Sequence, residues 1–241
     1  MNLSLTKPLV LSIDSALNGC AVGLQNTKDD IPLAASSREM SSGQAEHLVP
    51  MIEDVLAAAG KEYGDIGLIA VVNGPGAFTG IRIGIAAAKA LGLALEIPVI
   101  GVGTFESILH TALQSEENRG YARYLVILET KRTDFYVQQF DAQGNTVTHG
   151  KCASAEAIRD ELSAERTLLL GDAVKRIQKE WGTNPATIAA REITLADPIV
   201  TAKRAKELFL QEKIFTEIQP VYLRAPDVTK PKAEKIMKSK R

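Results

Sequence analysis

Runs of apolar residues and helically spaced apolar residues follow one another along the first part of the chain, and together they predict a lobe of strands and helices. Short apolar runs indicate five strands, over Leu9–Ile13, Cys20–Leu24, Ile31–Ser37, Ile66–Val72 and Pro98–Val102. Apolar positions three and four residues apart indicate an amphipathic helix over 44–59, which Gly60 ends. Two further helices are predicted, one over Ile81–Leu95 and one that Thr104 caps and that runs through Leu113.

The second half of the chain begins with the same hairpin pattern as the first. Leu9–Ile13 ends at Asp14 and is followed by a returning strand, and Tyr124–Leu128 ends at Glu129 and is followed by another. Further on, the pattern predicts strands at 146–152 and 167–170, helices at 154–163, 173–181 and 197–211, and an extended segment at 220–224. Hairpins followed by strand–helix alternation, occurring twice, predict an α/β fold of two duplicated lobes with mixed sheets flanked by helices.

This repeat divides the chain into three parts. Residues 1–104 are expected to form the N-terminal lobe, 105–218 a second, smaller lobe, and 219–241 a C-terminal extended segment with a basic tail. Within the second part, Ser154 and Asp197 directly precede helical patterns, so we expect both to cap helices.

The segment Asn73–Arg82 is a glycine-rich turn between a predicted strand and a predicted helix. Its glycines let the backbone turn sharply, and Thr79 is expected to cap the helix. The helix N-terminus and Arg82 would then supply positive charge for an anion or for a partner's carboxylate. A well-capped turn that only shapes the fold explains the same residues, so both interpretations stay open.

Two familiar phosphate-binding motifs are excluded at this turn. A Walker loop needs a lysine directly after its last glycine, and the first lysine after the turn is Lys89. A dinucleotide fingerprint needs two residues between its second and third glycines, whereas three residues separate Gly76 from Gly80.

Composition describes an ordinary globular protein with one uneven charge distribution. The 241 residues are 45% hydrophobic and 24% charged, and the formal net charge is −1. Six basic residues and one acid lie between Val228 and Arg241. A solvated terminus is the simpler explanation of this tail, and contact with RNA phosphates is the alternative.

Cysteine usage and the apolar stretches indicate a cytoplasmic location without membrane contact. Cys20 and Cys152 are the only cysteines and belong to no ligand cluster, which fits a reducing compartment. The N-terminus has no secretion signal. The longest apolar stretch, Ile81–Leu95, contains Arg82 and Lys89, so we expect it to be too short and too polar to span a bilayer.

The two acidic hairpins resemble those of the actin, sugar-kinase and Hsp70 superfamily, in which such hairpins face a nucleotide in the cleft between two actin-like lobes. Within that superfamily, the sequence Gly74–Gly84 is similar to the signature of the TsaB family. The segments Leu11–Ser15, His47–Pro50 and Pro220–Val228 extend the resemblance over almost the whole chain. One turn departs from the family pattern, since Glu129-Thr130-Lys131-Arg132 stands where the family usually shows Asp-Ala-Arg.

The resemblance implies a non-catalytic subunit for making threonylcarbamoyladenosine (t6A) at adenosine 37 of tRNAs that read codons beginning with A. The implied partners are the transferase TsaD, which would carry out the chemistry, and the ATPase TsaE in a ternary complex. The resemblance also implies a homodimer when TsaD is absent, and contact with tRNA only indirectly through the complex.

Small residues after the glycine turn would form the surface for this partner. Small side chains let another helix approach closely, and the helix after the turn carries glycine or alanine at many positions. The expected partner interface or anion-binding loop therefore comprises Gly74, Pro75, Gly76, Thr79, Gly80, Arg82, Gly84 and Ala88.

No catalytic or metal-binding set of residues can be named from the sequence. His47, His110 and His149 are far apart, and no two have the spacing of helical metal ligands, so we expect no metal site and no peptidase activity. Asp14 and Ser15, with Glu129, would line a degenerate nucleotide cleft.

No cofactor is expected to be required, although weak or shared binding of ATP and Mg²⁺ at the complex interface is compatible with the sequence. The alternative function is a free-standing ATP-dependent small-molecule kinase or ATPase. It would use Asp14 and Glu129 to hold a magnesium–nucleotide, and it would need a general base that the sequence does not identify.

Overall fold

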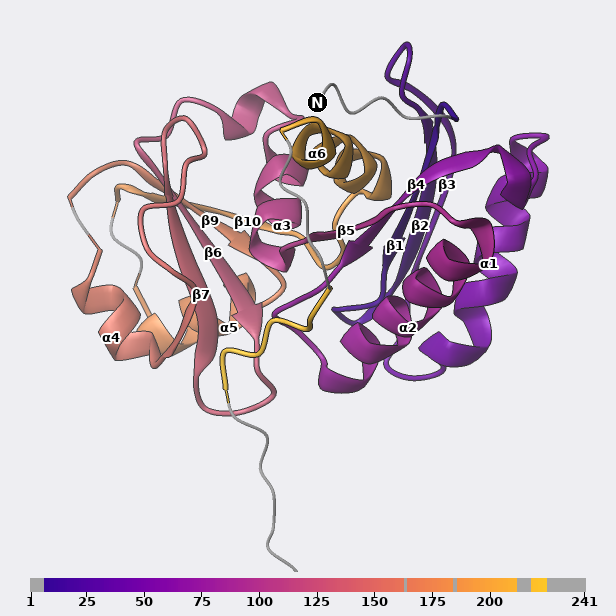
Figure 1. Ribbon diagram of the computed structural model, residues 1–241. Coiled ribbons are helices and arrows are strands. Elements are labelled where there is room, and N and C mark those ends of the chain that lie inside the picture. Colours follow the sequence, from indigo (N-terminus) through magenta and orange to yellow (C-terminus); the bar gives the residue numbers. More distant parts are fainter. Residues whose placement is uncertain (1–6, 163, 184–185, 212–217, 225–241) are drawn as a thin grey trace, which may run out of the picture.

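Two mixed five-stranded sheets, one from each half of the chain, form the framework of the protein (Figure 1). A computed structural model describes residues 7–162, 164–183, 186–211 and 218–224. The first sheet contains β1 (Leu9–Asp14), β2 (Gly19–Asn26), β3 (Ile31–Glu39), β4 (Ile66–Val72) and β5 (Val99–Val102). The second contains β6 (Arg123–Glu129), β7 (Phe135–Asp141), β8 (Lys151–Ala153), β9 (Thr167–Gly171) and β10 (Ile188–Glu192).

The second sheet repeats the topology of the first. The strand orders are β3-β2-β1-β4-β5 and β10-β9-β6-β7-β8, so β6 to β10 stand in the places of β1 to β5. In both sheets the first three strands pair antiparallel and the last two join in parallel. The predicted α/β fold of two duplicated lobes is therefore confirmed, and Asp14 and Glu129 end equivalent strands.

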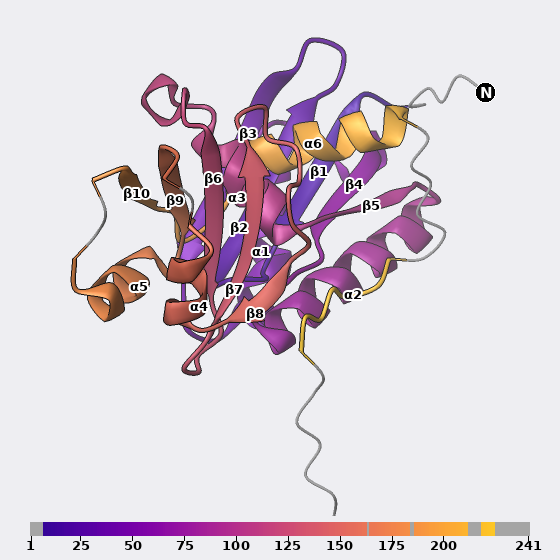
Figure 2. The same ribbon diagram turned by 90° about the vertical axis from the view of Figure 1, so that its left-hand side faces the viewer.

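Helices cover both faces of each sheet. They are α1 (Gln44–Ala58), α2 (Phe78–Leu95), α3 (Thr104–Ala112), α4 (Ala155–Asp160), α5 (Val174–Trp181) and α6 (Pro198–Leu210), with short 3-10 turns at Tyr63–Asp65 and Glu116–Asn118. α1 and α2 lie on one face of the first sheet, and α4 and α5 lie on the outer face of the second (Figures 1 and 2). α3 and α6 pack against each other between the two sheets.

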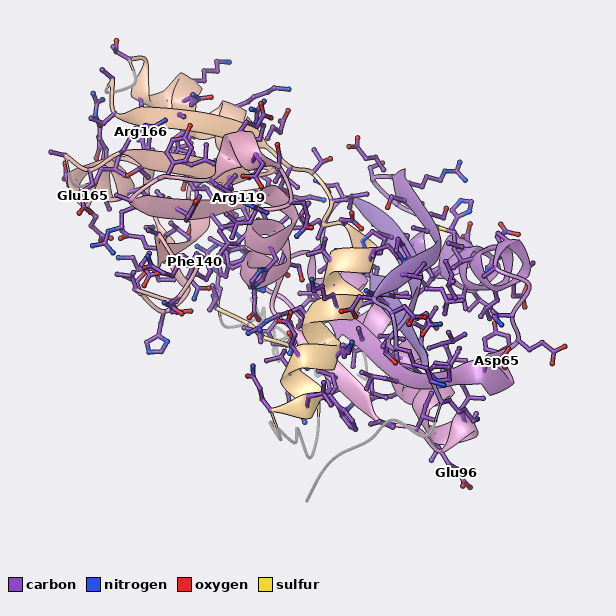
Figure 3. The ribbon with its side chains drawn as sticks, turned by 90° about the horizontal axis from the view of Figure 1, so that it is seen from above. Asp65, Glu96, Arg119, Phe140, Glu165 and Arg166 are labelled. Atoms are coloured by element: carbon purple, nitrogen blue, oxygen red, sulfur yellow. The ribbon has the colours of Figure 1, made fainter. Side chains whose placement is uncertain are left out.

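The helix α6 belongs in space to the first lobe, which corrects the assignment of residues 105–218 to the second. Ala202, Ala205 and Leu208 of α6 share an apolar cluster with residues of β1, β4 and β5. The hydroxyl of Ser12 in β1 donates a hydrogen bond of 2.6 Å to the carbonyl oxygen of Pro198. Seen from above, α6 lies between the lobes, with Glu96 at the far side of one and Glu165 at the far side of the other (Figure 3).

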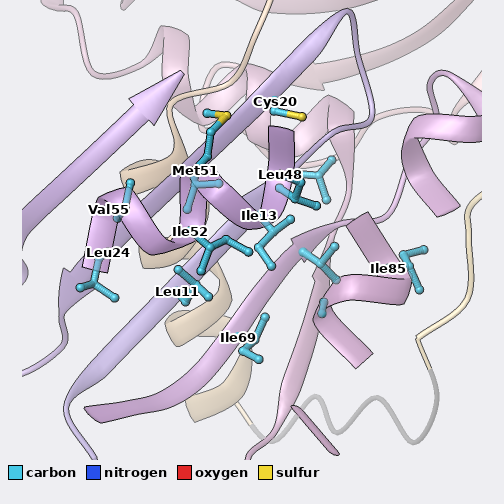
Figure 4. Packing of buried hydrophobic residues seen from close by; sticks show 14 of the residues in the cluster. Leu11, Ile13, Cys20, Leu24, Leu48, Met51, Ile52, Val55, Ile69 and Ile85 are labelled. Carbon is cyan, nitrogen blue, oxygen red and sulfur yellow. The ribbon is translucent and has the colours of Figure 1, made fainter. Parts of the chain in front are cut away.

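The largest apolar cluster lies between the first sheet and α1 and α2. Leu48, Ile52 and Val55 project from one face of α1 toward β1 and β2, as their spacing predicts. Figure 4 shows these side chains packed against Leu11 and Ile13. Each fully buried aliphatic side chain of this kind stabilises the fold by about 1.5–3 kcal/mol, so this layer anchors the first lobe.

Two of the predicted helix caps are confirmed and two are wrong. The hydroxyl of Ser154 accepts a hydrogen bond from the amide of Ala157 at 3.2 Å, and the carboxylate of Asp197 accepts one from Ile199 at 2.8 Å. Thr79, however, lies inside the first turn of α2 and is exposed. The cap residue is Ala77, whose amide donates instead to the first hairpin, so α2 begins earlier than the apolar pattern indicates. Thr104 is the first residue of α3 rather than its cap, which is Gly103, and its buried hydroxyl has no hydrogen-bond partner.

Among the described residues, α2 is the one helix with the length and composition of a membrane span. Its mean hydropathy is 1.5. It has 18 residues because it starts at Phe78, three residues before the predicted Ile81. The expectation that this stretch is too short and too polar is therefore wrong on both counts. Its inward face packs on β4 and on α1, so α2 is part of the first lobe's helical layer.

Candidate functional site

A cleft of about 790 Å³ opens between the two lobes. The first hairpin turn, the residues before α1 and the first turn of α2 form the wall from the first lobe. Residues 129–132 and Asp172 form the wall from the second lobe, and Tyr222 and Arg224 complete the lining. The candidate site therefore combines the glycine-rich turn, the second acidic hairpin and the C-terminal segment, which lie far apart in the sequence.

The glycines of the turn provide the space in which the first hairpin packs against α2. A Cβ atom at Gly76 would overlap the carbonyl oxygen of Ala16, and one at Gly80 would overlap that of Ser15. The amide of Ala77 donates to the Ala16 carbonyl at 2.7 Å, and the Ser15 hydroxyl donates to the Gly80 carbonyl at 2.8 Å. These contacts explain the glycines through backbone packing.

The beginning of the turn is held by two other segments. Gly74 has a φ of 110°, in the region that favours glycine, and its bond to the buried Pro75 is cis. Its carbonyl accepts a hydrogen bond from the amide of Thr104 at 2.9 Å. A Cβ atom at Gly74 would lie 2.8 Å from the carbonyl oxygen of Val221. Gly74 therefore joins β4, α3 and the C-terminal segment.

Asp14 and Ser15 are buried beneath the first hairpin turn and do not line the cleft. Both side chains are 1% exposed, and one oxygen of Asp14 accepts the amide of Ala16 at 2.8 Å. The other oxygen has no partner, and burial raises the pKa of Asp14 to about 6. Burial of the Cys20 thiol, together with the nearby charge of Asp14, raises the pKa of Cys20 to about 11. Of the three predicted cleft residues, Glu129 alone reaches the cleft.

Glu129 belongs to a charged cluster on the other wall. Its carboxylate lies 2.9 Å from the guanidinium of Arg176 and accepts the amide of Lys131 at 3.0 Å. The amide of Glu129 donates to Asp172 at 2.9 Å. Burial raises the pKa of Asp172 to about 6, against the lowering effect of that hydrogen bond. The second hairpin therefore holds its acid through ion pairing within its own lobe.

These positions do not fit the magnesium–nucleotide that the superfamily resemblance implies. A metal-bridged nucleotide needs carboxylate oxygens that reach the ligand. Asp14 is covered by its own turn, and Glu129 is paired with Arg176. Leu17, at the tip of the first turn, packs into the apolar cluster of the second lobe. Among the described residues, no group of three His, Cys, Asp or Glu residues could hold a metal ion.

Arg82 lies beside two aromatic rings that line the cleft, Phe78 and Tyr222. Its guanidinium carbon is 3.7 Å from the centre of the Phe78 ring, and its Nε donates to the hydroxyl of Tyr222 at 2.9 Å. The rings of Phe78 and Tyr222 are stacked, with centroids 5.2 Å apart. Arg82 therefore presents its charge on an aromatic platform.

Gly84 and Ala88 face the interior, so their predicted role in a partner interface is wrong. A Cβ atom at Gly84 would lie 2.7 Å from the Ser15 hydroxyl, and Ala88 is fully buried under the sheet. Their small size serves packing within the lobe. The exposed face of α2 carries other small and apolar residues, which are Thr79, Ala86, Ala90, Leu93 and Ala94.

Three residues at the cleft were not nominated from the sequence. Asp172 follows an apolar run, as Asp14 and Glu129 do, and this shared pattern is a signal that could have found it. Phe78 and Tyr222 meet only in the folded chain, and no local pattern connects residues that far apart.

Comparison with known proteins gives one family match and several full-length relatives. The model of the TsaD family, tRNA N6-adenosine threonylcarbamoyltransferase, matches residues 38–194. The TsaB protein of Escherichia coli strain K12 is 28% identical over 224 residues, which cover 89% of this chain and 94% of that protein. The TsaB protein of Haemophilus influenzae is 22% identical and covers 89% of this chain and 93% of its own length.

Solved structures with the same fold come from Pseudomonas aeruginosa. YeaZ is 21% identical, with a TM-score of 0.76 and coverage of 89% of this chain and 99% of that chain. A second structure, described as an uncharacterized protein with similarity to peptidase YEAZ, is 22% identical, with a TM-score of 0.77, and covers 90% of this chain and 99% of its own. At these identities the likeness concerns the fold, and it extends over both lobes.

Proposed function

Since the chain belongs to the TsaD family and is similar to TsaB along nearly its whole length, we propose that it is a subunit of the t6A biosynthesis system. In this role it binds TsaD and, with TsaE, supports transfer of the threonylcarbamoyl group to adenosine 37 of tRNAs that read codons beginning with A. It acts in the cytoplasm, and the reacting groups belong to TsaD.

The burial of Asp14 is the observation that best supports a non-catalytic role. In the superfamily that the chain resembles, the acidic hairpins face the nucleotide, so a kinase or ATPase of this fold would need its first hairpin open to the ligand. Here Gly76 and Gly80 bring the turn onto α2, and Leu17 extends from it into the second lobe. These contacts support the proposal that the chain requires no cofactor of its own and that any ATP or Mg²⁺ is bound weakly or shared at the interface with TsaD.

The outward face of α2, together with α1, is the surface that we propose for TsaD. Ala86 and Ala90 are small enough for a helix to approach closely, and the Leu93 side chain is 82% exposed. On α1, Val49 is 49% exposed. The TsaD family model spans both helices, so TsaD has counterparts of them. Two equivalent helix pairs can pack with near two-fold symmetry, so the same surface would also serve the homodimer that we propose when TsaD is absent.

Reconstituted tRNA modification tests this function. TsaD, TsaE and the adenylate-forming enzyme would be assayed for t6A formation with and without this chain. We expect formation to depend on its presence, and equal rates in its absence would rule out the proposed role. Titration of the isolated chain with magnesium–ATP distinguishes the proposed subunit from the alternative kinase. Binding at micromolar concentrations with turnover would support a free-standing enzyme.

The docking surface is tested by adding charge to it. Leu93→Glu should weaken capture of TsaD at least tenfold and reduce t6A formation when the chain is limiting. Val147→Glu is the matched control, because Val147 is 45% exposed in the second lobe, away from α2. Equal loss of TsaD binding in both variants would contradict a role for α2.

A further inference from the structure

We propose that the platform of Phe78, Arg82 and Tyr222 binds unpaired nucleotides of an RNA loop, so that this chain contacts the tRNA directly. The inference rests on the proposed function, which supplies an RNA substrate modified in a loop. It goes beyond that function because the complex alone would not require this subunit to touch RNA.

The geometry of the platform suits a nucleobase. The Phe78 side chain is 43% exposed and that of Tyr222 is 38% exposed, although aromatic rings usually lie buried. The rings are stacked at 5.2 Å, and the Arg82 guanidinium covers the Phe78 ring at 3.7 Å. Exposed aromatic rings beside arginine are the elements that bind single-stranded nucleic acid, because bases stack on the rings and phosphates pair with the cation.

A further cation faces the platform from the opposite wall of the cleft. Lys131 is exposed on the second hairpin turn, and it lines the same cleft as Phe78 and Tyr222. Of the three cleft carboxylates, Glu129 pairs with Arg176 and Asp172 accepts the Glu129 amide, whereas Glu46 of α1 is exposed on the first-lobe wall. The basic stretch Val228–Arg241 lies outside the described residues and is not part of this site.

The C-terminal segment fixes Tyr222 in place. The amide of Val221 donates to the Asn73 carbonyl at 2.8 Å, and the Asn73 side chain donates to Gln219 at 3.2 Å. On the other side of Tyr222, the guanidinium of Arg224 pairs with Asp134 of the second lobe. A ring anchored on both sides loses little conformational entropy when a base stacks on it, so binding costs less.

An RNA ligand fits the platform better than a second protein surface does. A partner helix would find its small and apolar contacts along Ala86, Ala90 and Leu93, farther along α2. The platform lies at the N-terminal end of the same helix and combines flat rings with cations, which is the composition of nucleic-acid sites. TsaD and RNA would therefore contact different parts of α2.

The test measures RNA affinity and TsaD affinity separately on the same variants. A fluorescently labelled anticodon stem-loop RNA would be titrated with the full-length chain, alone and saturated with TsaD, and followed by anisotropy. We expect Phe78→Ala and Tyr222→Ala each to weaken RNA binding about fivefold or more in both settings. TsaD capture should be unchanged. Tyr222→Phe keeps the ring and should retain nearly all of the affinity.

Ile31→Ala provides the matched control, because Ile31 is a large apolar residue, 50% exposed, on β3. Its RNA affinity should equal that of the unaltered chain. Three results would overturn the proposal. The unaltered chain could show no measurable RNA binding, or the Phe78→Ala and Tyr222→Ala variants could bind RNA as tightly as the unaltered chain does. The third result is loss of TsaD binding in those two variants while their RNA affinity stays intact. The last result would identify the platform as a protein contact.

The outcome is independent of the test of the proposed function. If t6A forms equally well without the chain while RNA binding still depends on Phe78 and Tyr222, the RNA site stands and the t6A role fails. If t6A formation needs the chain while RNA affinity is unaffected by both variants, the t6A role stands and the RNA site fails.

Discussion

The carbonyl oxygen of Ser15 occupies the space in which a side chain at residue 80 would begin. The Ser15 hydroxyl also donates a hydrogen bond of 2.8 Å to the carbonyl of Gly80. The first hairpin turn and the start of α2 are therefore a single packed unit. This contact explains why a long helix tolerates a glycine in its first turn, although glycine weakens helices by about 1 kcal/mol relative to alanine.

Gly80→Ala should therefore destabilise the fold, against the usual gain from alanine in a helix. We expect a loss of about 3 kcal/mol in the free energy of unfolding, measured by urea denaturation, because the new methyl group overlaps backbone atoms of Ser15. Gly64→Ala is the control, since nothing lies within 4 Å of its Cβ position, and it should change stability by less than about 0.5 kcal/mol. Equal effects of the two substitutions would disprove the packing argument.

Two alanines two residues apart on α2 should respond differently to enlargement. Ala88→Leu places extra volume under the first sheet and should cost about 1–3 kcal/mol of stability. Ala86→Leu adds the same volume at an exposed position and should leave stability nearly unchanged. Thermal unfolding of both variants measures the difference. A stable Ala88→Leu protein would mean that the inward face of α2 is not tightly packed.

Leu17 lies in the turn between β1 and β2 of the first lobe, but it should stabilise the protein by packing in the second lobe. Leu17→Ala removes a side chain that is 3% exposed and packed in the second lobe's cluster, so we expect a loss of about 3 kcal/mol in urea unfolding. Leu93→Ala removes the same atoms from an 82% exposed position and should have little effect. If Leu17→Ala proves as mild as the control, the turn does not connect the lobes.

The buried carboxyl of Asp14 should make stability depend on pH. Its pKa rises from 3.8 to about 6 on folding, so between these values the folded protein holds a proton that the unfolded chain releases. Stability must therefore fall as pH increases through this window, by up to about 3 kcal/mol from this group. Asp172, whose pKa is also about 6, acts in the same direction.

Asp14→Asn should remove the Asp14 share of this dependence, because the amide oxygen can still accept the Ala16 amide. Urea unfolding at pH 4.5 and pH 7.5 would measure the change, with Asp54→Asn on the exposed face of α1 as control. We expect a clearly smaller stability difference between the two pH values in the Asp14 variant. A difference as large as that of the unaltered chain would show that Asp14 is not the source.

Much of the fold follows from local apolar patterns, because each strand and helix of the repeat buries its own face. The run Ile66–Val72 predicts β4 to the residue, and the spacing of Leu48, Ile52 and Val55 predicts which face of α1 is buried. The edge strand β10 was not predicted. Its sequence, Ile188–Glu192, is short and only partly buried, so its apolar signal is weak.

The parts that sequence patterns missed depend on contacts between distant segments. Thr79 has the right chemistry for a cap, but the hairpin carbonyl of Ala16 takes the amide of Ala77 and the helix starts before Thr79. The small size of Gly84 and Ala88 correctly predicts close packing. The surface that packs against them is the chain's own first lobe and not another protein. Sequence alone does not say which surface approaches a small residue.

The position of α6 has a consequence for how the protein is made. One face of the first sheet, with Val10, Leu68 and Ile100, is covered by a helix that the ribosome synthesises after the whole second sheet. Until residues 198–210 have emerged, that apolar face has no cover, and the nascent first lobe is a target for chaperones and for aggregation. The two lobes must therefore complete their folding together, and a fragment that ends before α6 should not yield a stable first lobe.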